Sequence, residues 1–219
     1  MIPRTLKASY FIVAAPMMRM NGALYRLIRA PKSGVKAHLG PGRKRYLQGW
    51  TNVDANMFTA KCDVWTDLRY GLPFRDNSLH AAYSHHVIEH LPNMRAHLAE
   101  VFRCLQPGGV YRVGGPNGDS AIRKFIEDEK SWFSHFPEDR RSIGGRLENF
   151  IICAGEHLTI LTESFLRELL EDAGFVNISL CKPIVDSGFP ELFADALKQE
   201  HESDMDCPHT LVLEAAKPE

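Results

Sequence analysis

The chain has 219 residues, of which 44% are hydrophobic, so it is long enough to bury one full core. Its five cysteines are scattered and form no C-x-x-C pair, which argues against a disulfide framework or a structural zinc site and favours a reducing, cytoplasmic setting. No apolar run has the length of a membrane-spanning helix.

Charge is divided unevenly along the chain. Residues 1–53 carry ten Lys and Arg and no Asp or Glu, although the formal net charge of the whole chain is −1. This basic segment is either the solvated face of a terminal helix or a surface attracted to an anion, such as a membrane or a phosphorylated substrate. Nucleic acid is not expected, because the basic residues are confined to this end and no nucleic-acid-binding module is present.

Residues 4–30 are predicted to be helical in two pieces separated by Pro16. In the second piece Arg19, Gly22 and Arg26 share one face, and Met20 and Leu24 lie largely on the other. We predict that residues 1–34 form a basic amphipathic helical cap over a binding cleft, with peripheral contact at a membrane surface as the alternative. A faint likeness of this segment to a signal peptide is discounted.

Strands and helices alternate from Val35 onward. Strands are predicted at 35–39, 49–54, 62–67, 79–86, 110–117, 176–182 and 209–215, and helices at 95–105 and 162–175. This order predicts a Rossmann-like α/β fold with a mainly parallel seven-stranded sheet and helices on both faces. Residues 35–219 then form one domain, with an irregular substrate-side insert at about 117–158. Its aromatic and arginine side chains either line a pocket or form the core of a lid.

Glycines and acids stand where the predicted strands end, which is where open α/β sheets bind ligands. Gly40 and Gly42 follow the first strand, and Asp54 and Asp67 end the second and third. Glycines allow a tight turn close to a ligand, and a carboxylate can accept from ribose hydroxyls or an amino group. A dinucleotide site is not favoured, because G-x-G-x-x-G is absent and Asp54 follows Gly42 by only 12 residues.

The string "HVIEH" at residues 86–90 matches the H-x-x-E-H signature of some zinc hydrolases. His86 and His90 would share a face of a helix, with Glu89 beside them. Pro92 leaves room for only a short helix, and no third ligand stands out, so no metal is predicted. A metallohydrolase is the least favoured alternative.

Several ordered motifs together resemble class I S-adenosylmethionine-dependent methyltransferases, in particular the type 11 branch. They are "HLGPG", "GWTNVD", "LPFRDNSLHAAYSHHVIEHL" and "LQPGGVYRV". The resemblance covers about residues 35–116, and "LTESFLRELLEDAGF" extends it. It implies the class I methyltransferase fold and S-adenosyl-L-methionine as cofactor.

The resemblance also implies roles for matching residues. Gly40 and Gly42 would face the methionine part of the cofactor, and Asp54 would hold its ribose. Asp67 and the Leu68 backbone would meet the adenine, and Ser84 and His85 would lie near the sulfonium. Pro41 stands where this branch usually has cysteine, and it removes an N–H donor from the turn.

The function expected from this resemblance is methyl transfer to a small-molecule acceptor, most simply a hydroxyl of a sugar, glycoside or secondary metabolite. His86 is the first candidate for a catalytic base and His157 the second. The basic N-terminal segment suits an acidic or phosphorylated acceptor. The alternative from another class is a cofactor-binding regulatory or scaffold protein without methyl transfer, for which Pro41 is the only positive sign.

Overall fold

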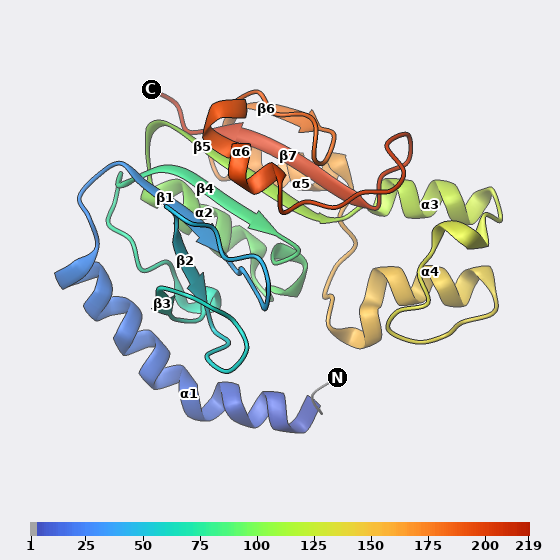
Figure 1. The fold of residues 1–219 in the computed structure, drawn as a ribbon, viewed down its shortest axis with the longest axis horizontal. Helices are drawn as coiled ribbons and strands as arrows, with labels where there is room; N and C mark the ends of the chain where they lie inside the picture. The colour runs from blue at the N-terminus through green and yellow to red at the C-terminus, as the bar shows by residue number, and fades with distance from the viewer. Residues whose placement is uncertain (1–3) are drawn as a thin grey trace.

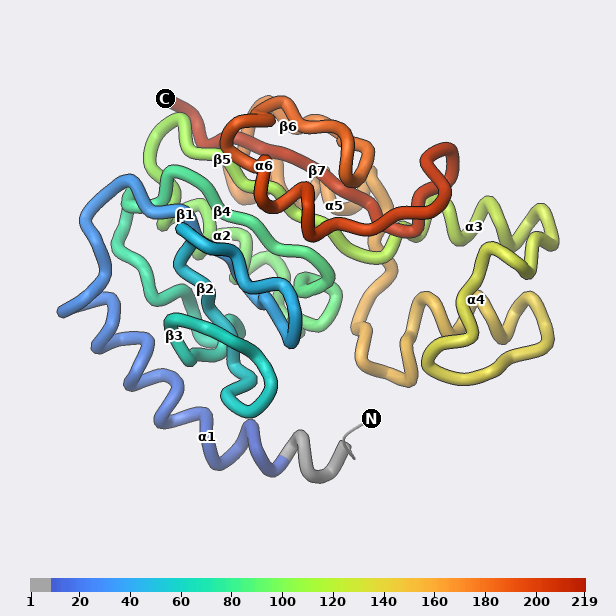
Figure 2. The backbone as a smooth tube through the Cα atoms, in the orientation of Figure 1, coloured from blue at the N-terminus to red at the C-terminus, as the bar shows by residue number. Residues whose placement is uncertain are grey.

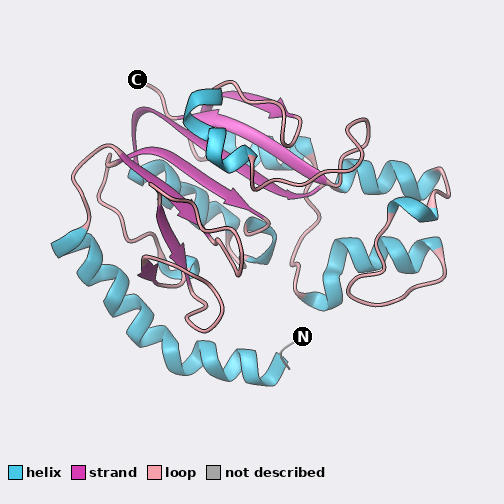
Figure 3. Ribbon diagram, in the orientation of Figure 1, coloured by secondary structure: helices cyan, strands magenta, loops and turns pink. Residues whose placement is uncertain are grey.

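The computed structural model describes residues 4–219, with side chains from residue 9 onward. Seven strands form one sheet (Figures 1 and 3). They are β1 (Val35–Leu39), β2 (Thr51–Asp54), β3 (Val64–Trp65), β4 (Leu79–His85), β5 (Leu105–Pro116), β6 (Val176–Cys181) and β7 (Thr210–Ala216). Their order is β3-β2-β1-β4-β5-β7-β6, and only β7 runs antiparallel to its neighbours.

The predicted mainly parallel seven-stranded sheet is therefore confirmed. All seven expected strands are present, although β3 is only two residues long and β5 begins earlier than the sequence pattern indicates. The connection from β1 to β2 contains no helix, as the short spacing between Gly42 and Asp54 predicts.

Helices cover both faces of the sheet (Figure 3). The α-helices are α1 (Arg4–Leu24), α2 (Met94–Cys104), α3 (Gly118–Ile126), α4 (Ile143–Ile152), α5 (Glu163–Asp172) and α6 (Pro190–Leu197). The shorter helices are η1 (Tyr25–Arg29), η2 (Leu68–Tyr70), η3 (Ile88–His90), η4 (Lys130–Trp132) and η5 (Cys153–Gly155). Leu98 of α2 and Leu169 of α5 belong to the main core on one face, while Phe193 of α6 packs with Trp50 on the other.

Helix α1 is continuous through Pro16, so the predicted break there is wrong. Proline removes the hydrogen bond to the carbonyl four residues earlier, and that carbonyl belongs to Ile12, which is 75% exposed and open to water. The helix runs along the β3 edge of the sheet (Figure 1). Thr66 Oγ1 donates to Met18 O at 3.0 Å and Asn21 Nδ2 donates to Trp65 O at 2.7 Å.

Gly22 allows α1 to approach the domain closely. A Cβ at this position would lie 2.7 Å from Thr66 Oγ1, closer than packed atoms tolerate. Within the part of the chain that the structure describes, no helix is both long enough and apolar enough to cross a bilayer.

The segment 117–158 forms a helical lobe, so the expectation of irregular structure there is wrong. Helices α3 and α4 lie together at one end of the molecule (Figure 2). Trp132, Phe133 and Phe150 pack against each other with ring centroids 4.9 to 6.1 Å apart. These aromatic side chains therefore form the core of the lobe.

A buried ionic network ties the C-terminal segment to the sheet. The Arg112 guanidinium on β5 donates to both carboxylate oxygens of Glu200 at 2.8 Å and to Glu214 Oε1 at 2.6 Å, and all three side chains are fully buried. Burial alone would lower the pKa of Arg112, but the two carboxylates raise it above its ordinary value. The guanidinium therefore stays charged, and its partners satisfy the geometry that a buried ion pair requires.

Candidate active site

A cavity of about 690 Å³ opens at the carboxyl ends of the strands. It lies beside β1 and β4, where the strand order reverses and where open α/β sheets bind their ligands. Its walls come from Phe11 and Ile12 of α1, from the loops after β1, β2 and β3, from residues 86–91 and from residues 155–158. Gly40, Asp54, Asp67, Leu68 and His86, all singled out in the sequence, line it together.

The turn after β1 brings backbone close to this cavity. Gly40 has φ of +75°, and a Cβ there would lie 2.5 Å from Val87 Cγ2, so only glycine fits. Gly42 does not line the cavity itself, but its N–H donates to Asp54 Oδ2 at 2.9 Å. The glycine turn and the end of β2 are thus fixed to one another.

Asp54 keeps acceptor capacity toward the cavity. Its Oδ1 accepts from Asn56 N at 2.7 Å and its Oδ2 from Gly42 N at 2.9 Å. Burial raises the pKa of this carboxyl above its usual value, and the backbone N–H groups of Asn56 and Gly42 partly offset the rise. Because each carboxylate oxygen has two lone pairs, both oxygens can still accept from a ligand hydroxyl.

Asp67 has a partner that the sequence did not indicate. Its carboxylate accepts from Arg69 Nε at 2.9 and 3.0 Å, from Arg69 Nη2 at 2.5 Å and from the Arg69 backbone N–H at 3.0 Å. The Arg69 guanidinium lies over the Phe11 ring of α1, 4.2 Å from its centroid. A ligand amino group that contacts Asp67 must therefore share the carboxylate with Arg69.

Ser84 and His85 lie beneath the cavity wall and do not line it. Ser84 is fully buried, with its Oγ 2.7 Å from Tyr111 Oη, and His85 is 4% exposed. Burial, together with the positive charges of neighbouring groups, lowers the pKa of His85 well below its usual range. This imidazole therefore stays neutral in the fold.

His86 is held on the cavity wall in an unusual backbone conformation. Its φ is +57°, in the left-handed region that non-glycine residues seldom adopt. Its Nδ1 lies 3.3 Å from Glu89 Oε1 and its Nε2 lies 3.3 Å from Thr210 Oγ1. The ring is thus oriented from both ends by side chains of two different elements.

Glu89 forms the centre of a cluster of histidines. Its side chain is fully buried, and burial raises its pKa, but the hydrogen bond and charge of His86 and the charge of His90 outweigh this and lower the pKa overall. His90 Nε2 lies 3.7 Å from Glu89 Oε1. His90 itself is exposed and lines the cavity.

His157 reaches this cluster from the other side of the cavity. Glu89 O accepts from Leu158 N and Glu156 O accepts from His90 Nδ1, both at 2.8 Å. These two hydrogen bonds join residues 89–90 to residues 156–158, the segment that contains His157. The rings of His90 and His157 have centroids 4.9 Å apart. Burial lowers the pKa of His157 below its ordinary value despite the opposing charge of Glu89.

The geometry changes how the "HVIEH" string is interpreted. His86 lies outside η3, so the two histidines are not one helical turn apart on an α-helix. Ligand-type atoms of Glu89, His90 and His157 nevertheless lie within 4.8 Å of one another. His157 is the third side chain that the sequence pattern did not supply.

Comparisons with known proteins agree with this geometry. Residues 53–113 match a type 11 family model described as a methyltransferase domain. A solved methyltransferase of Thermotoga maritima, described as a possible histamine N-methyltransferase, is 14% identical, with 97% of this chain and 96% of that chain covered and a TM-score of 0.52. A second, from Mesorhizobium loti, is 16% identical, with 93% and 97% covered and a TM-score of 0.51. No curated protein sequence matches the chain significantly.

The chain therefore has the class I methyltransferase fold, and its residues 53–113 match a methyltransferase domain. A third solved structure, a phosphoethanolamine N-methyltransferase of Haemonchus contortus with S-adenosylhomocysteine bound, is 14% identical with a TM-score of 0.50. The match covers 91% of this chain and 52% of that one. At such low identity these structures show the fold of the chain and not its acceptor.

The residues of the cavity fit S-adenosylmethionine. Gly40 brings backbone to the cavity wall, since a Cβ there would clash with Val87, and Asp54 offers acceptors for ribose hydroxyls. The cavity volume is within the range of small-molecule sites. The sequence did not predict the contacts that Glu89 and Thr210 make with His86, or the contact of Arg69 with Asp67. Each is a contact between side chains that no local pattern identifies.

Proposed function

We propose that this protein transfers a methyl group from S-adenosylmethionine to a hydroxyl of a small molecule, namely a sugar, a glycoside or a secondary metabolite. The observation that carries this proposal is His86 on the wall of the cofactor cavity, paired with the buried Glu89 behind it. A hydroxyl is a weak nucleophile that needs a base as it reacts, and a histidine held by a carboxylate suits that role.

S-adenosylmethionine, when bound, supplies a methyl group that is already activated on a sulfonium. The protein must then hold the acceptor oxygen in line with that methyl carbon, about 3 Å away. In our proposal His86 donates its Nδ1–H to Glu89 Oε1. Its Nε2 lone pair, which faces Thr210 Oγ1 in this structure, exchanges that contact for the acceptor hydroxyl and takes the proton that leaves it. His157, whose neighbours Glu156 and Leu158 line the cavity, is the second candidate base.

An acidic or phosphorylated acceptor is supported by a second cavity under α1. This space of about 550 Å³ is lined by Arg19, Arg26 and Arg69, and it shares Leu68 and Leu91 with the cofactor cavity. Arg69 is already paired with Asp67, but the Arg19 and Arg26 guanidinium groups attract anions and can bind phosphate in a bidentate manner. We further propose a cytoplasmic location, since no disulfide joins the described cysteines.

The test is an acceptor screen that measures formation of S-adenosylhomocysteine. Hydroxyl acceptors with and without a phosphate are compared with amine acceptors of similar size. We expect transfer to hydroxyls, with kcat lowered about 100-fold or more in His86→Ala and less in His157→Ala. His135→Ala, an exposed histidine in the lobe, is the matched control. Transfer to amines alone, or an unchanged kcat in His86→Ala, would contradict the proposal.

A further inference from the structure

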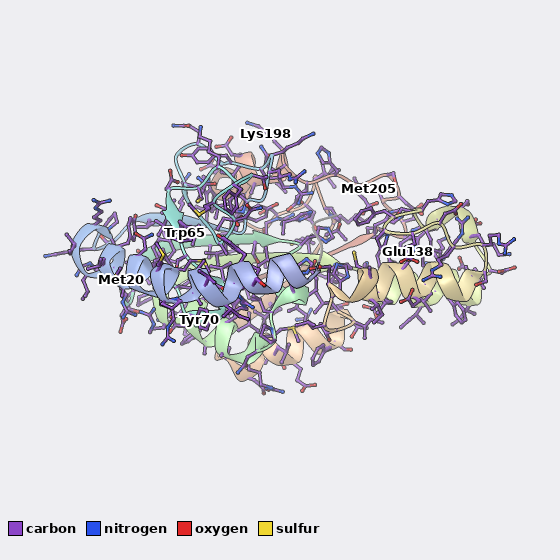
Figure 4. All side chains as sticks on the ribbon, turned by 90° about the horizontal axis from the view of Figure 1, so that it is seen from below. Met20, Trp65, Tyr70, Glu138, Lys198 and Met205 are labelled. Carbon is purple, nitrogen blue, oxygen red and sulfur yellow. The ribbon has the colours of Figure 1, made fainter. Side chains whose placement is uncertain are left out.

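Helix α1 and the π-helical turn η1 carry an apolar stripe on their outer side. Its members are Ile12, Val13, Met17, Met20, Leu24, Leu27 and Ile28, and they are 47% to 75% exposed. At 100° per residue the five members within α1 fall on an arc of about 140°. We call these seven side chains the outer apolar face. Figure 4 shows α1 along the outside of the molecule, with Met20 labelled on it.

The opposite side of α1 is already packed on the domain. Ala14, Met18 and Gly22 are buried, and the Met18 carbonyl accepts from Thr66. The outer apolar face therefore cannot be the side that the domain covers. A contiguous apolar surface of this length is uncommon on a monomer and marks a contact with a membrane or another protein.

Charge indicates which of these contacts is favoured. Arg19, Arg26 and Arg29 lie along the same helical segment, and residues 1–53 contain ten basic and no acidic side chains. If two copies paired through this face, two segments with only positive charge would be brought together. An anionic lipid surface instead supplies the opposite charge and covers the apolar side chains.

We propose that α1 and η1 bind the surface of an anionic bilayer through the outer apolar face, lying parallel to the membrane. No described helix can span a bilayer, so the contact is peripheral. Phe11 and Ile12 also line the cofactor cavity, and docking therefore holds one wall of the active site at the membrane. This proposal does not depend on the identity of the methyl acceptor.

The test is co-sedimentation of the full chain with vesicles, without cofactor or acceptor. Vesicles contain either phosphatidylcholine alone or phosphatidylcholine with phosphatidylglycerol. The variant replaces three exposed members of the face, Met17→Ser, Leu24→Ser and Leu27→Ser. The matched control replaces exposed apolar side chains elsewhere on the surface, namely Ile126→Ser, Leu180→Ser and Val185→Ser.

We expect the wild type and the control to bind the anionic vesicles at least ten-fold more tightly than the neutral ones. The triple variant should lose at least ten-fold in affinity for anionic vesicles, and added salt should weaken wild-type binding. Arg29→Gln with Lys32→Gln, which leaves the apolar side chains and the arginines of the second cavity in place, should lower anionic binding several-fold even if the triple variant does not fold.

The proposal would be overturned by absence of wild-type binding to anionic vesicles, by equal binding to neutral vesicles, or by equal loss of binding in the control. A dimer in vesicle-free solution that the triple variant abolishes would also overturn it, and would assign the face to a second copy of the chain. Methyl transfer is not measured here, so failure of the proposed function leaves this outcome unaffected.

Discussion

At the scale of single residues, Asp54 and Asp67 should contribute unequally to cofactor binding. We expect Asp54→Ala to weaken S-adenosylhomocysteine binding by about 1–3 kcal/mol, because buried ribose hydroxyls lose a charged acceptor and the glycine turn loses its tie to β2. Asp67→Ala should cost less, since Arg69 already occupies that carboxylate. Isothermal titration calorimetry measures both, with the exposed Asp139→Ala as control. Wild-type affinity in both variants would show that the cofactor lies elsewhere.

The histidine cluster provides a second test at this scale. We expect purified protein to contain well below one equivalent of zinc, and EDTA to leave its melting temperature unchanged. The reason is that Glu89 Oε1 already faces His86 and His90, while backbone carbonyls accept from Nδ1 of His90 and His157. Elemental analysis decides the question. Close to one equivalent of zinc, lost in His157→Ala and retained in His135→Ala, would instead establish a metal site.

Individual residues differ in how far sequence could place them. The acid at the end of β2 and the glycine after β1 were predictable, because strand ends in a parallel sheet meet at one edge. The Arg69–Asp67 pair and the approach of His157 to Glu89 were not, since they depend on side-chain direction and on contacts between distant segments. Ser84 and His85 were placed on the right strand, but the depth at which each lies required the coordinates.

At the scale of elements, the docking of α1 depends on one glycine. We expect Gly22→Val to lower stability by about 1–3 kcal/mol, because the added side chain would overlap Thr66. The variant should melt earlier and be cleaved faster within α1 by protease. Gly144→Ala in α4 is the control, because a Cβ there meets nothing within 4 Å. Equal melting temperatures for Gly22→Val and wild type would mean that α1 is not docked as described.

Strands were easier to predict than the helices outside the main domain. Alternating and apolar runs marked all seven strands, because burial on a sheet imposes that pattern directly. Helices α3 and α4 are short, and α4 has glycines at its second and third positions, 144 and 145. Their stability comes from packing around Trp132 and Phe133, which is tertiary information that a local pattern does not contain.

At the scale of the whole molecule, buried neutral histidines should make the fold sensitive to acid. Burial lowers the pKa of His38 to about 4, although the hydrogen bond that its Nδ1 donates to Asn52 Oδ1 opposes this. Burial also lowers the pKa of His97 to about 4, against opposing contributions from the Leu68 backbone and Glu100. Both rings therefore remain neutral in the fold at pH values where an unfolded histidine, with pKa near 6.5, is already protonated.

The sign of the effect follows from proton linkage. Between pH 6.5 and about 4 the unfolded chain binds more protons than the native chain at these two positions, so stability falls as the pH falls. Each histidine should remove up to about 3 kcal/mol over that window, while above pH 6.5 neither changes the stability. Together they amount to a large part of the 5–15 kcal/mol that is typical for a folded domain.

Urea unfolding at a series of pH values between 4 and 8 measures this dependence. We expect His97→Leu to reduce the slope of unfolding free energy against pH below 6.5 by close to one proton, because the buried site no longer titrates. His80→Gln, an exposed position on β4, should leave the slope unchanged. Carboxylates also titrate near the lower end of this window, but they are common to all three proteins and cancel in the comparison. A slope in His97→Leu equal to that of wild type would show that this imidazole is protonated within the native fold.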